Sequence, residues 1–479
     1  MNLLIHFPIL QILIPFAGAI FAALSFRTNW SYFIALIAIA LNAILSIYSY
    51  QSMAGAALYQ MGNWPAHVGI EYKVDYLNQP IIIFFNLALL FYLLLGRYLT
   101  QELILNHVSE KYRNLFYSLL LFAHTGYLGV VSTNDLFNIY VFIEISSLAT
   151  YVLISIAKNR SSLIGAFDYL MLGTIGATLI LIGIGLIFAK TGYLNITEIT
   201  MINAQQRADN LFISVNYCAL AFVMTGILLK FGFFPMHFWM RRAYNSAPSI
   251  ILTYIAAIGT IFSLYLIIRF SSIVFAINQL DNQVLLYALK SLSLVSIIAG
   301  GLLAMSSKTV KEVVIYSATA QIGYILLMFS VGAQEIIAYM ALIDALNKVT
   351  WFTIIAHMQT QIVDLSFDKD ITIHSSSIFK FLVAMALIFS AGLPLGVVFF
   401  LKVRMLNILL TANLYIEFIV AIIGSILSIL YNFKLAKFFF RLNVDGHIIK
   451  INKGLTGLII LISFQIMSLF YISNIFGGN

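Results

Sequence analysis

Five ionisable side chains lie inside long apolar stretches of this sequence, where the chemistry open to them is proton binding and release. The bases are Lys230, Lys348 and Lys402, and the acids are Glu144 and Asp344. A charge inside a bilayer costs about 2.5–3.5 kcal/mol on insertion scales, so five unpaired charges would cost on the order of 12–17 kcal/mol. Ser, Thr or Asn would hold helices together more cheaply. Pairing as plain structural glue is the alternative, but the series favours a proton pathway.

Two of the three lysines stand beside an interruption of their own helix. Gly232 and Pro235 follow Lys230, and residues 391–397, which contain two glycines and a proline, precede Lys402. A proline inside a membrane helix frees backbone carbonyls that only protein or cavity water can satisfy. Matching interruptions in the two halves of a chain indicate an inverted-repeat transporter with ion sites on the broken helices.

A carboxylate is expected close to each of two lysines. Asp344 precedes Lys348 by four residues, which places both on one helix face, and Glu144 is expected near Lys230. A carboxylate favours the charged form of lysine, whereas burial favours the neutral form. At about 7 Å and an effective dielectric of about 20, the attraction is roughly 2.4 kcal/mol. A modest rearrangement of such a pair can therefore load or release a proton.

The composition indicates that these groups lie in a protein embedded in lipid. Of 479 residues, 62% are hydrophobic and 9% are charged, against about 25% charged in soluble domains. The net charge of +8 is spread over single basic residues between apolar runs, which indicates topology signals and not a nucleic-acid surface. One cysteine, Cys218, excludes disulfides and CxxC sites. No HExxH, nucleotide-binding or triad motif is present, so we expect no metal, no cofactor and no enzyme active site.

Apolar runs predict an all-α membrane protein with about fourteen transmembrane helices, because each is close to the roughly 20 residues that a bilayer requires. The runs lie near residues 5–25, 30–50, 79–98, 114–132, 136–156, 163–189, 211–231, 250–275, 284–305, 313–331, 336–358, 378–400, 414–438 and 456–476. No polar segment is long enough for a soluble domain, so residues 1–479 are expected to form one polytopic membrane domain.

Basic residues predict the orientation of the chain. The odd loops hold Arg27, Arg97, Lys111, Arg113, Lys158, Arg160, Arg241, Arg242, Lys308, Lys311, Lys369, Lys380, Lys434, Lys437, Arg441, Lys450 and Lys453. The even loops and their edges hold Lys73, Lys190, Arg207, Arg269 and Arg404. Lys290, near the start of the ninth helix, is expected to snorkel to the interface. The bias predicts cytoplasmic odd loops and both termini outside.

Four groups of residues resemble a known family. They are residues 134–144; residues 234–239 with 243–244 and 247–248; Lys311 with 316–324; and residues 391–394 with Lys402. The chain resembles the antiporter-like subunits shared by respiratory complex I and the Mrp-type multisubunit sodium/proton antiporters. It is most similar to the D subunit of the Mrp type. Residues 62–70 also resemble the short outer segment of that subunit.

The resemblance implies two inverted five-helix repeats, at about 114–275 and 284–438, with discontinuous seventh and twelfth helices. It also implies a proton channel of buried charges, in which Glu144, Lys230 and Lys402 match functional positions and Lys348 matches a lysine of many members. Supporting roles are expected for Asp344, Pro235, His237, Pro394, Thr260 and Ser263. His237 is expected to form hydrogen bonds at a helix end and not to bind a ligand.

Some positions depart from the family pattern. The departures are Ile261 in place of a lysine on the eighth helix, Arg241-Arg242 in place of Pro-Asp, Asp344 in place of a histidine, and one proline, Pro394, in place of two. Water held by Thr260 and Ser263 would have to bridge the position of Ile261. Asp344 is also placed to hold Lys348 permanently charged. Transport could therefore be altered or lost in this member.

Three functions follow from these patterns. The first is a proton-translocating subunit of a multisubunit cation (sodium)/proton antiporter, with other subunits, protons and a monovalent cation as its partners. The second is the equivalent pumping subunit of a complex I-type NADH-quinone oxidoreductase, itself without a redox centre. The third is a divergent assembly subunit that does not conduct, which Ile261 and the Asp344–Lys348 pair favour.

Overall fold

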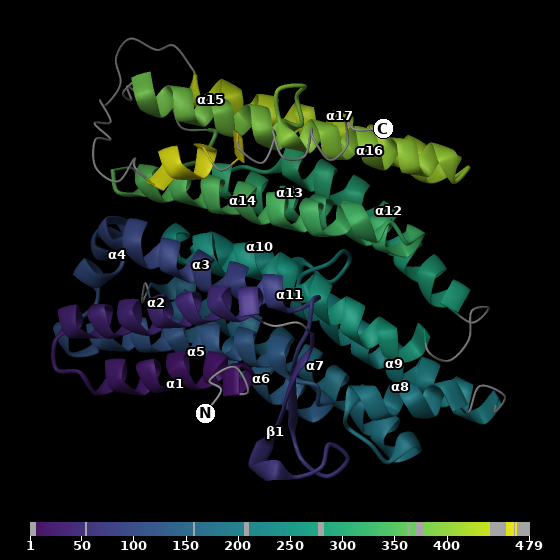
Figure 1. The fold of residues 1–479 in the computed structure, drawn as a ribbon. Helices are drawn as coiled ribbons and strands as arrows, with labels where there is room; N and C mark the ends of the chain where they lie inside the picture. Colours follow the sequence, from purple (N-terminus) through teal and green to yellow (C-terminus); the bar gives the residue numbers. More distant parts are fainter. Residues whose placement is uncertain are drawn as a thin grey trace. The chain divides into compact units, whose positions relative to one another are not determined.

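Helices make up almost all of the chain that the computed structural model describes (Figure 1). The described residues are 6–52, 55–156, 159–205, 210–275, 282–361, 365–368, 377–440, 457–463 and 465–466. They fall into two compact units: residues up to 94, 105–231 and 261–283 form the first, and residues 95–104, 232–260 and those from 284 onward form the second. Each unit is described by itself.

The first unit contains the elements that carry Glu144 and Lys230. Its elements are α1 (Phe7–Leu24), α2 (Thr28–Ser52), β1 (Ala57–Gln60), β2 (Glu71–Val74), α3 (Gln79–Leu95, except its last residue), α5 (Arg113–Ser132), α6 (Leu136–Ser155), α7 (Arg160–Thr191), α8 (Ile196–Gln205), α9 (Asn210–Lys230) and the second half of α11 (Ser249–Phe275). The two strands pair antiparallel, with Ala57 opposite Val74. The sequence analysis does not predict this hairpin.

The second unit contains the elements that carry Lys348 and Lys402. Its elements are α4 (Arg97–Leu103), α10 (Phe238–Ser246), the first half of α11, most of α12 (Asn282–Ser306), α13 (Val310–Val331), α14 (Gln334–Gln359), α15 (Ser377–Ala391), α16 (Val397–Thr411) and α17 (Tyr415–Phe439).

Polar residues at the helix ends explain where several helices begin and stop. Asp135 accepts a hydrogen bond from the Asn138 amide at 2.7 Å and so caps α6, while Asn159 caps α7 in the same way. Such caps satisfy N–H groups that have no partner inside the helix. Gly192 ends α7 and Gly332 ends α13, both in the left-handed conformation that glycine adopts without strain.

Close helix contact positions the helix that bears Lys230. Helix α7 packs along α9, and a Cβ on Gly226 would clash with the carbonyl oxygen of Gly176. Only glycine therefore fits at this crossing. Small residues at helix contacts replace the hydrophobic driving force that lipid cannot supply.

Amide side chains join the first helices of the chain to α5. Gln11, Asn42, Asn86 and His124 come from α1, α2, α3 and α5, and each is fully buried. Asn42 donates to the Asn86 side-chain oxygen at 3.1 Å, and the His124 ring lies 2.9 Å from the same oxygen. Hydrogen bonds of this kind hold helices together inside a membrane.

The expected all-α membrane fold is confirmed, and most helix bounds agree with the apolar runs. Within the described part of the chain, nine helices are long and apolar enough to cross a bilayer, or ten if α3 and the bent segment after it form one span. The total of about fourteen stays a prediction, as do the repeat boundaries at 114–275 and 284–438. The run expected at 456–476 lies largely outside the described residues.

Two helix expectations need correction. The run at 79–98 is not one straight helix, because the chain bends by 65° between Leu95 and Arg97. The run at 378–400 contains the expected break, between α15 and α16, but it ends later than expected because α16 continues to Thr411. Gly392, with a φ of +74°, begins the break between them.

Candidate functional site

Glu144 and Lys230 form an ion pair in the first unit. The Lys230 Nζ lies 3.4 Å from the Glu144 Oε1, and the lysine side chain is 3% exposed against 22% for the glutamate. The two groups are therefore much closer than the about 7 Å assumed from the sequence. A lysine this buried needs an anion or a lost proton to avoid a large desolvation cost. Glu144 supplies that anion from a neighbouring helix.

Lys230 stands at the end of its helix. It is the last residue of α9, where the negative end of the helix dipole favours a cation. The chain then leaves the helical path: Gly232 has a φ of +67°, the Phe234–Pro235 peptide is cis, and α10 begins only at Phe238. The discontinuous seventh helix is thus present, with the lysine directly before the break.

His237 lies at the start of α10 but does not cap it. Its side chain makes no capping hydrogen bond to the helix, and its buried Nδ1 atom has no hydrogen-bond partner among the described residues. Its ring stacks on Phe234 and Phe238, with centroids 5.1 and 4.9 Å away, and meets the edge of Tyr316. Aromatic rings thus surround the imidazole, and the expected hydrogen bond at the helix end stays a prediction.

Lys348 and Asp344 form a tighter pair in the second unit. The Lys348 Nζ lies 2.6 Å from the Asp344 Oδ2, and both side chains are 6% exposed. The Thr260 hydroxyl donates to the same carboxylate at 3.0 Å and also accepts from the lysine. Thr260 thus completes a three-residue cluster. Ser263, three residues further along α11, is buried in the first unit. Ile261, which follows Thr260 in the sequence, is buried as well.

Lys402 lies after the second helix break. Pro394 sits between α15 and α16, and the ammonium of Lys402 is 3.5 Å from the place where a Cβ on Gly392 would stand. The ammonium donates to the Ser428 hydroxyl at 2.7 Å and lies 5.5 Å from the ring centre of Tyr324. The discontinuous twelfth helix is therefore also present, and it brings backbone close to the lysine.

Charged side chains hold α10 to the start of α13. The Arg241 Nε donates to the Glu312 carboxylate at 2.9 Å, and this hydrogen bond raises the pKa of Arg241. Lys311 donates to the carbonyls of Asn245, at 3.1 Å, and Ala247. Lys311 and Arg241 were assigned as topology signals, but both bond to other parts of the protein.

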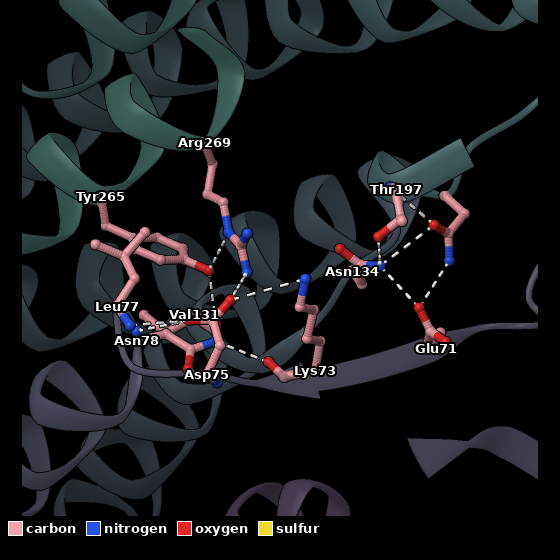
Figure 2. Close-up of polar contacts among 11 residues, drawn as sticks. Glu71, Lys73, Asp75, Leu77, Asn78, Val131, Asn134, Thr197, Tyr265 and Arg269 are labelled. Carbon is pink, nitrogen blue, oxygen red and sulfur yellow. Dashed lines mark hydrogen bonds and ion pairs between the residues drawn. The ribbon is translucent and has the colours of Figure 1, made fainter. Parts of the chain in front are cut away.

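A second polar cluster lies in the first unit where the hairpin meets the ends of α5 and α11. Figure 2 shows Arg269 reaching both Tyr265 and Asp75, with Lys73 on the other side of the carboxylate. The Arg269 Nη2 atom lies 3.5 Å from the Asp75 Oδ2, and the Tyr265 hydroxyl donates to the Val131 carbonyl at 2.8 Å. Arg269 is 8% exposed, so it is a buried pairing residue and not the loop-edge charge expected from the sequence.

Lys290 also differs from its expectation. Its ammonium lies 3.4 Å from the Glu417 carboxylate, and the two side chains are 17% and 12% exposed. It pairs inside the protein and does not snorkel. The basic residues Lys158, Arg207, Lys369, Arg441, Lys450 and Lys453 lie outside the described residues.

The site residues therefore form separate groups. Glu144 and Lys230 meet in the first unit, whereas Thr260, Asp344, Lys348 and Lys402 belong to the second. The step from Lys230 to Lys348 stays a prediction. In the part of the chain that the structure describes, no three His, Cys, Asp or Glu residues are grouped so as to hold a metal ion.

Comparison with known proteins points to one family. Residues 133–428 match the family model "NADH:quinone oxidoreductase/Mrp antiporter, TM". The NADH-quinone oxidoreductase N subunit of Desulforudis audaxviator is 32% identical over 352 residues, which cover 71% of this chain and 67% of that protein. The Na(+)/H(+) antiporter D subunit of Bacillus subtilis is 28% identical, over 67% of this chain and 63% of that protein.

Two solved structures share the fold. A chain of an archaeal membrane-bound sulfane sulfur reductase aligns with a TM-score of 0.86 at 22% identity, covering 98% of this chain and 95% of that one. A chain of the Mrp complex from a Dietzia species aligns with a TM-score of 0.85 at 17% identity, covering 99% and 96%. Both solved structures are multisubunit membrane complexes.

Proposed function

This chain belongs to the NADH:quinone oxidoreductase/Mrp antiporter family, as an antiporter-like membrane subunit, and we propose that it moves protons through buried Glu and Lys residues within a multisubunit cation/proton antiporter. The observation that carries the proposal is the pair of Glu144 and Lys230 beside a helix break. Any change in the separation of a buried ion pair alters how strongly the lysine holds its proton.

The remaining lysines extend the same chemistry. The Lys348 ammonium contacts a carboxylate and a hydroxyl group, and the Lys402 ammonium contacts a hydroxyl group and an aromatic ring. Both are buried, but Lys348 has a carboxylate beside it, whereas no described carboxylate pairs with Lys402. A proton passing along such a series meets sites of different affinity, as a directional pathway requires. The second half of the pathway is part of this proposal.

The proposal also covers the partners of the chain and its orientation in the membrane. The chain would work with other subunits in a bacterial inner membrane, exchanging protons for sodium or another monovalent cation. The basic-residue bias supports termini on the outer side. That orientation puts the hairpin of β1 and β2, which lies between the second and third helices, on the outer side as well.

The test is dye-reported cation/proton exchange in inside-out vesicles that carry the complete complex. Glu144→Ala and Lys230→Ala should assemble and lose most of the exchange. Glu110→Ala is the matched acidic control, since Glu110 is 90% exposed, and it should exchange at the wild-type rate. Unchanged exchange in both buried-site variants would reject the proposal.

A second candidate is the proton-pumping subunit of a complex I-type oxidoreductase. It is favoured by the 32% identity to an N subunit of an NADH-quinone oxidoreductase. Purification of the native complex separates the two: flavin and iron–sulfur partners would favour the oxidoreductase, and small membrane subunits alone would favour the antiporter. A non-conducting scaffold would leave exchange unchanged in every variant above.

A further inference from the structure

A polar cavity lies beside the Asp344–Lys348 pair, within the second unit. Its volume is about 30 Å³, and both members of the pair line it. Its other polar side chains are Ser317, Gln321, Asn347, Ser390, Tyr431 and Asn432. A buried water needs at least about 10–15 Å³ and two to four polar partners. The cavity meets both conditions for about two waters.

Two side chains outside the lysine series shape one wall of this cavity. The Ser390 hydroxyl of α15 donates to the Asn432 side-chain oxygen at 2.7 Å. The Asn432 amide donates to the Ser428 carbonyl at 2.8 Å along α17. An Asn side chain can donate two hydrogen bonds and accept two. Asn432, which is 3% exposed, therefore keeps one donor and one acceptor for a molecule in the cavity.

The same face of α17 leads to the next lysine. Ser428 lies one turn before Asn432, and its hydroxyl accepts from the Lys402 ammonium at 2.7 Å. An ammonium has three N–H donors. Besides Ser428, the described contact of this ammonium is the face of Tyr324, and no described carboxylate lies within 4 Å of it. Lys402 is 7% exposed, so further acceptors for its N–H groups have to come from within the protein interior.

We propose that this cavity is a water-binding site, held by Ser390 and Asn432, that connects Lys348 to Lys402. The inference rests on the proposed proton-carrying function and names residues beyond the Glu and Lys series. A proton leaves the Lys348 ammonium for a water oxygen, and one of that water's own protons moves on. The transfer ends when the neutral amine of Lys402 gains an N–H bond. Lys348 is left neutral, so charge is conserved.

In this scheme Ser390 and Asn432 are positioning residues. Asn432 neither gains nor loses a proton, because its amide serves only to orient the water. Asn432 donates to the carbonyl of Ser428, whose hydroxyl accepts from Lys402, so a water held at Asn432 stands next to the residue that binds this lysine. The Asp344 carboxylate restores the charged form of Lys348 when the next proton arrives. If the side chains at this wall could not bind water, both lysines would stay buried but no water would connect them.

The first arm of the test is exchange in the complete complex with Asn432→Leu, which replaces the amide by a side chain of similar size that cannot bind water. Exchange should fall about tenfold, equivalent to roughly 1.4 kcal/mol in the barrier. Asn432→Ser, which can still bind water, should keep most of the activity. Asn407→Leu is the matched control, because it makes the same change at an exposed position of α16.

The second arm detects the water directly. X-ray radiolysis turns bound water into hydroxyl radicals that oxidise neighbouring side chains. Trp351 and Tyr431 line the cavity although they are only 4% and 3% exposed. They should be oxidised faster than Tyr254, which is 2% exposed and not among the cavity residues. The difference should vanish in Asn432→Leu.

Four outcomes decide between the inference and its alternatives. Slower exchange in Asn432→Leu together with fast oxidation of Trp351 and Tyr431 supports the water site. Wild-type exchange in Asn432→Leu, while Lys230→Ala is inactive, overturns the inference and leaves the proposed function standing. Oxidation of Trp351 and Tyr431 no faster than that of Tyr254 also overturns it. Wild-type exchange in Lys230→Ala rejects the proposed function itself.

Discussion

Glu144 and Lys230 meet at 3.4 Å although 86 residues separate them in the sequence. The contact joins the middle of α6 to the last residue of α9, immediately before the chain turns at Gly232. One partner is almost fully buried, whereas the other keeps about a fifth of its surface exposed. Glu144 is therefore the less enclosed member of the pair.

Removing the negative charge of this pair should lower the stability of the protein. Glu144→Gln leaves Lys230 buried without an anion, and breaking a buried pair costs up to roughly 3–5 kcal/mol. Because Glu144 is partly exposed, we expect a loss at or below the lower end of that range. Thermal unfolding of the purified complex measures it. A variant as stable as the wild type would show that the pair does not stabilise the fold.

The contact between α10 and α13 should depend on the buried carboxylate of Glu312. Glu312 is 5% exposed and accepts from both Arg241 and the Lys308 amide, whereas the Arg241 side chain is 53% exposed. Glu312→Leu should therefore lower the free energy of unfolding by about 1–3 kcal/mol, since donors lose their acceptor. Lys308→Met, with its side chain at the surface, should change it little. Equal thermal midpoints for Glu312→Leu and Lys308→Met would contradict this dependence.

Asp75 should anchor the hairpin through two kinds of contact. Its carboxylate pairs with Arg269 and also accepts from the amides of Leu77 and Asn78 at the start of α3 (Figure 2). Asp75→Ala would leave Arg269 buried without its anion, at a cost of roughly 2–4 kcal/mol. Hydrogen exchange at residues 71–78 should become faster. Unchanged exchange there would mean that the hairpin is held by other contacts.

Asp135 provides a pH test outside the spans. Burial raises the pKa of the Asp135 carboxyl above its usual value. The folded protein therefore holds this proton at higher pH than the unfolded chain. The corresponding stability is present below the unfolded pKa of about 3.9 and is lost as pH rises through the folded pKa.

Asp135→Asn should remove this pH dependence. The Asn138 amide would keep its acceptor, because the asparagine side-chain oxygen can replace the carboxylate at the cap. The free energy of unfolding of Asp135→Asn, relative to wild type, should rise from about pH 4 toward neutral pH. Thermal midpoints measured at several pH values test this. Parallel curves for the two proteins would refute it.

Much of the fold could be predicted because lipid imposes length and composition on each helix. The apolar runs locate most spans to within a few residues, and the Gly and Pro residues near Lys230 and Lys402 locate both breaks. The bend after Leu95 falls at Gly96, but a single glycine without a nearby proline did not distinguish this position from the other glycines in apolar runs. It occurs where the apolar run was expected to continue to residue 98.

The pairing of charges could be predicted only where both partners share a helix. Asp344 and Lys348 are four residues apart, so their contact follows from helix geometry. Arg269 and Asp75, like Lys290 and Glu417, meet only through the tertiary fold. Single basic residues near helix ends look alike in the sequence whether they face a partner or the lipid headgroups. The cavity beside Lys348 had no sequence signal, because its lining comes from helices α13, α14, α15 and α17.

The central claim is that the buried Lys230 ammonium carries protons for exchange. Its most direct test is the rate of proton flux in vesicles containing the complete complex with Lys230→Met, which keeps the length and burial of the side chain but cannot bind a proton. Lys308→Met is the control at an exposed lysine. The account predicts that flux is abolished in Lys230→Met and unchanged in Lys308→Met. Wild-type flux in an assembled Lys230→Met complex would contradict it.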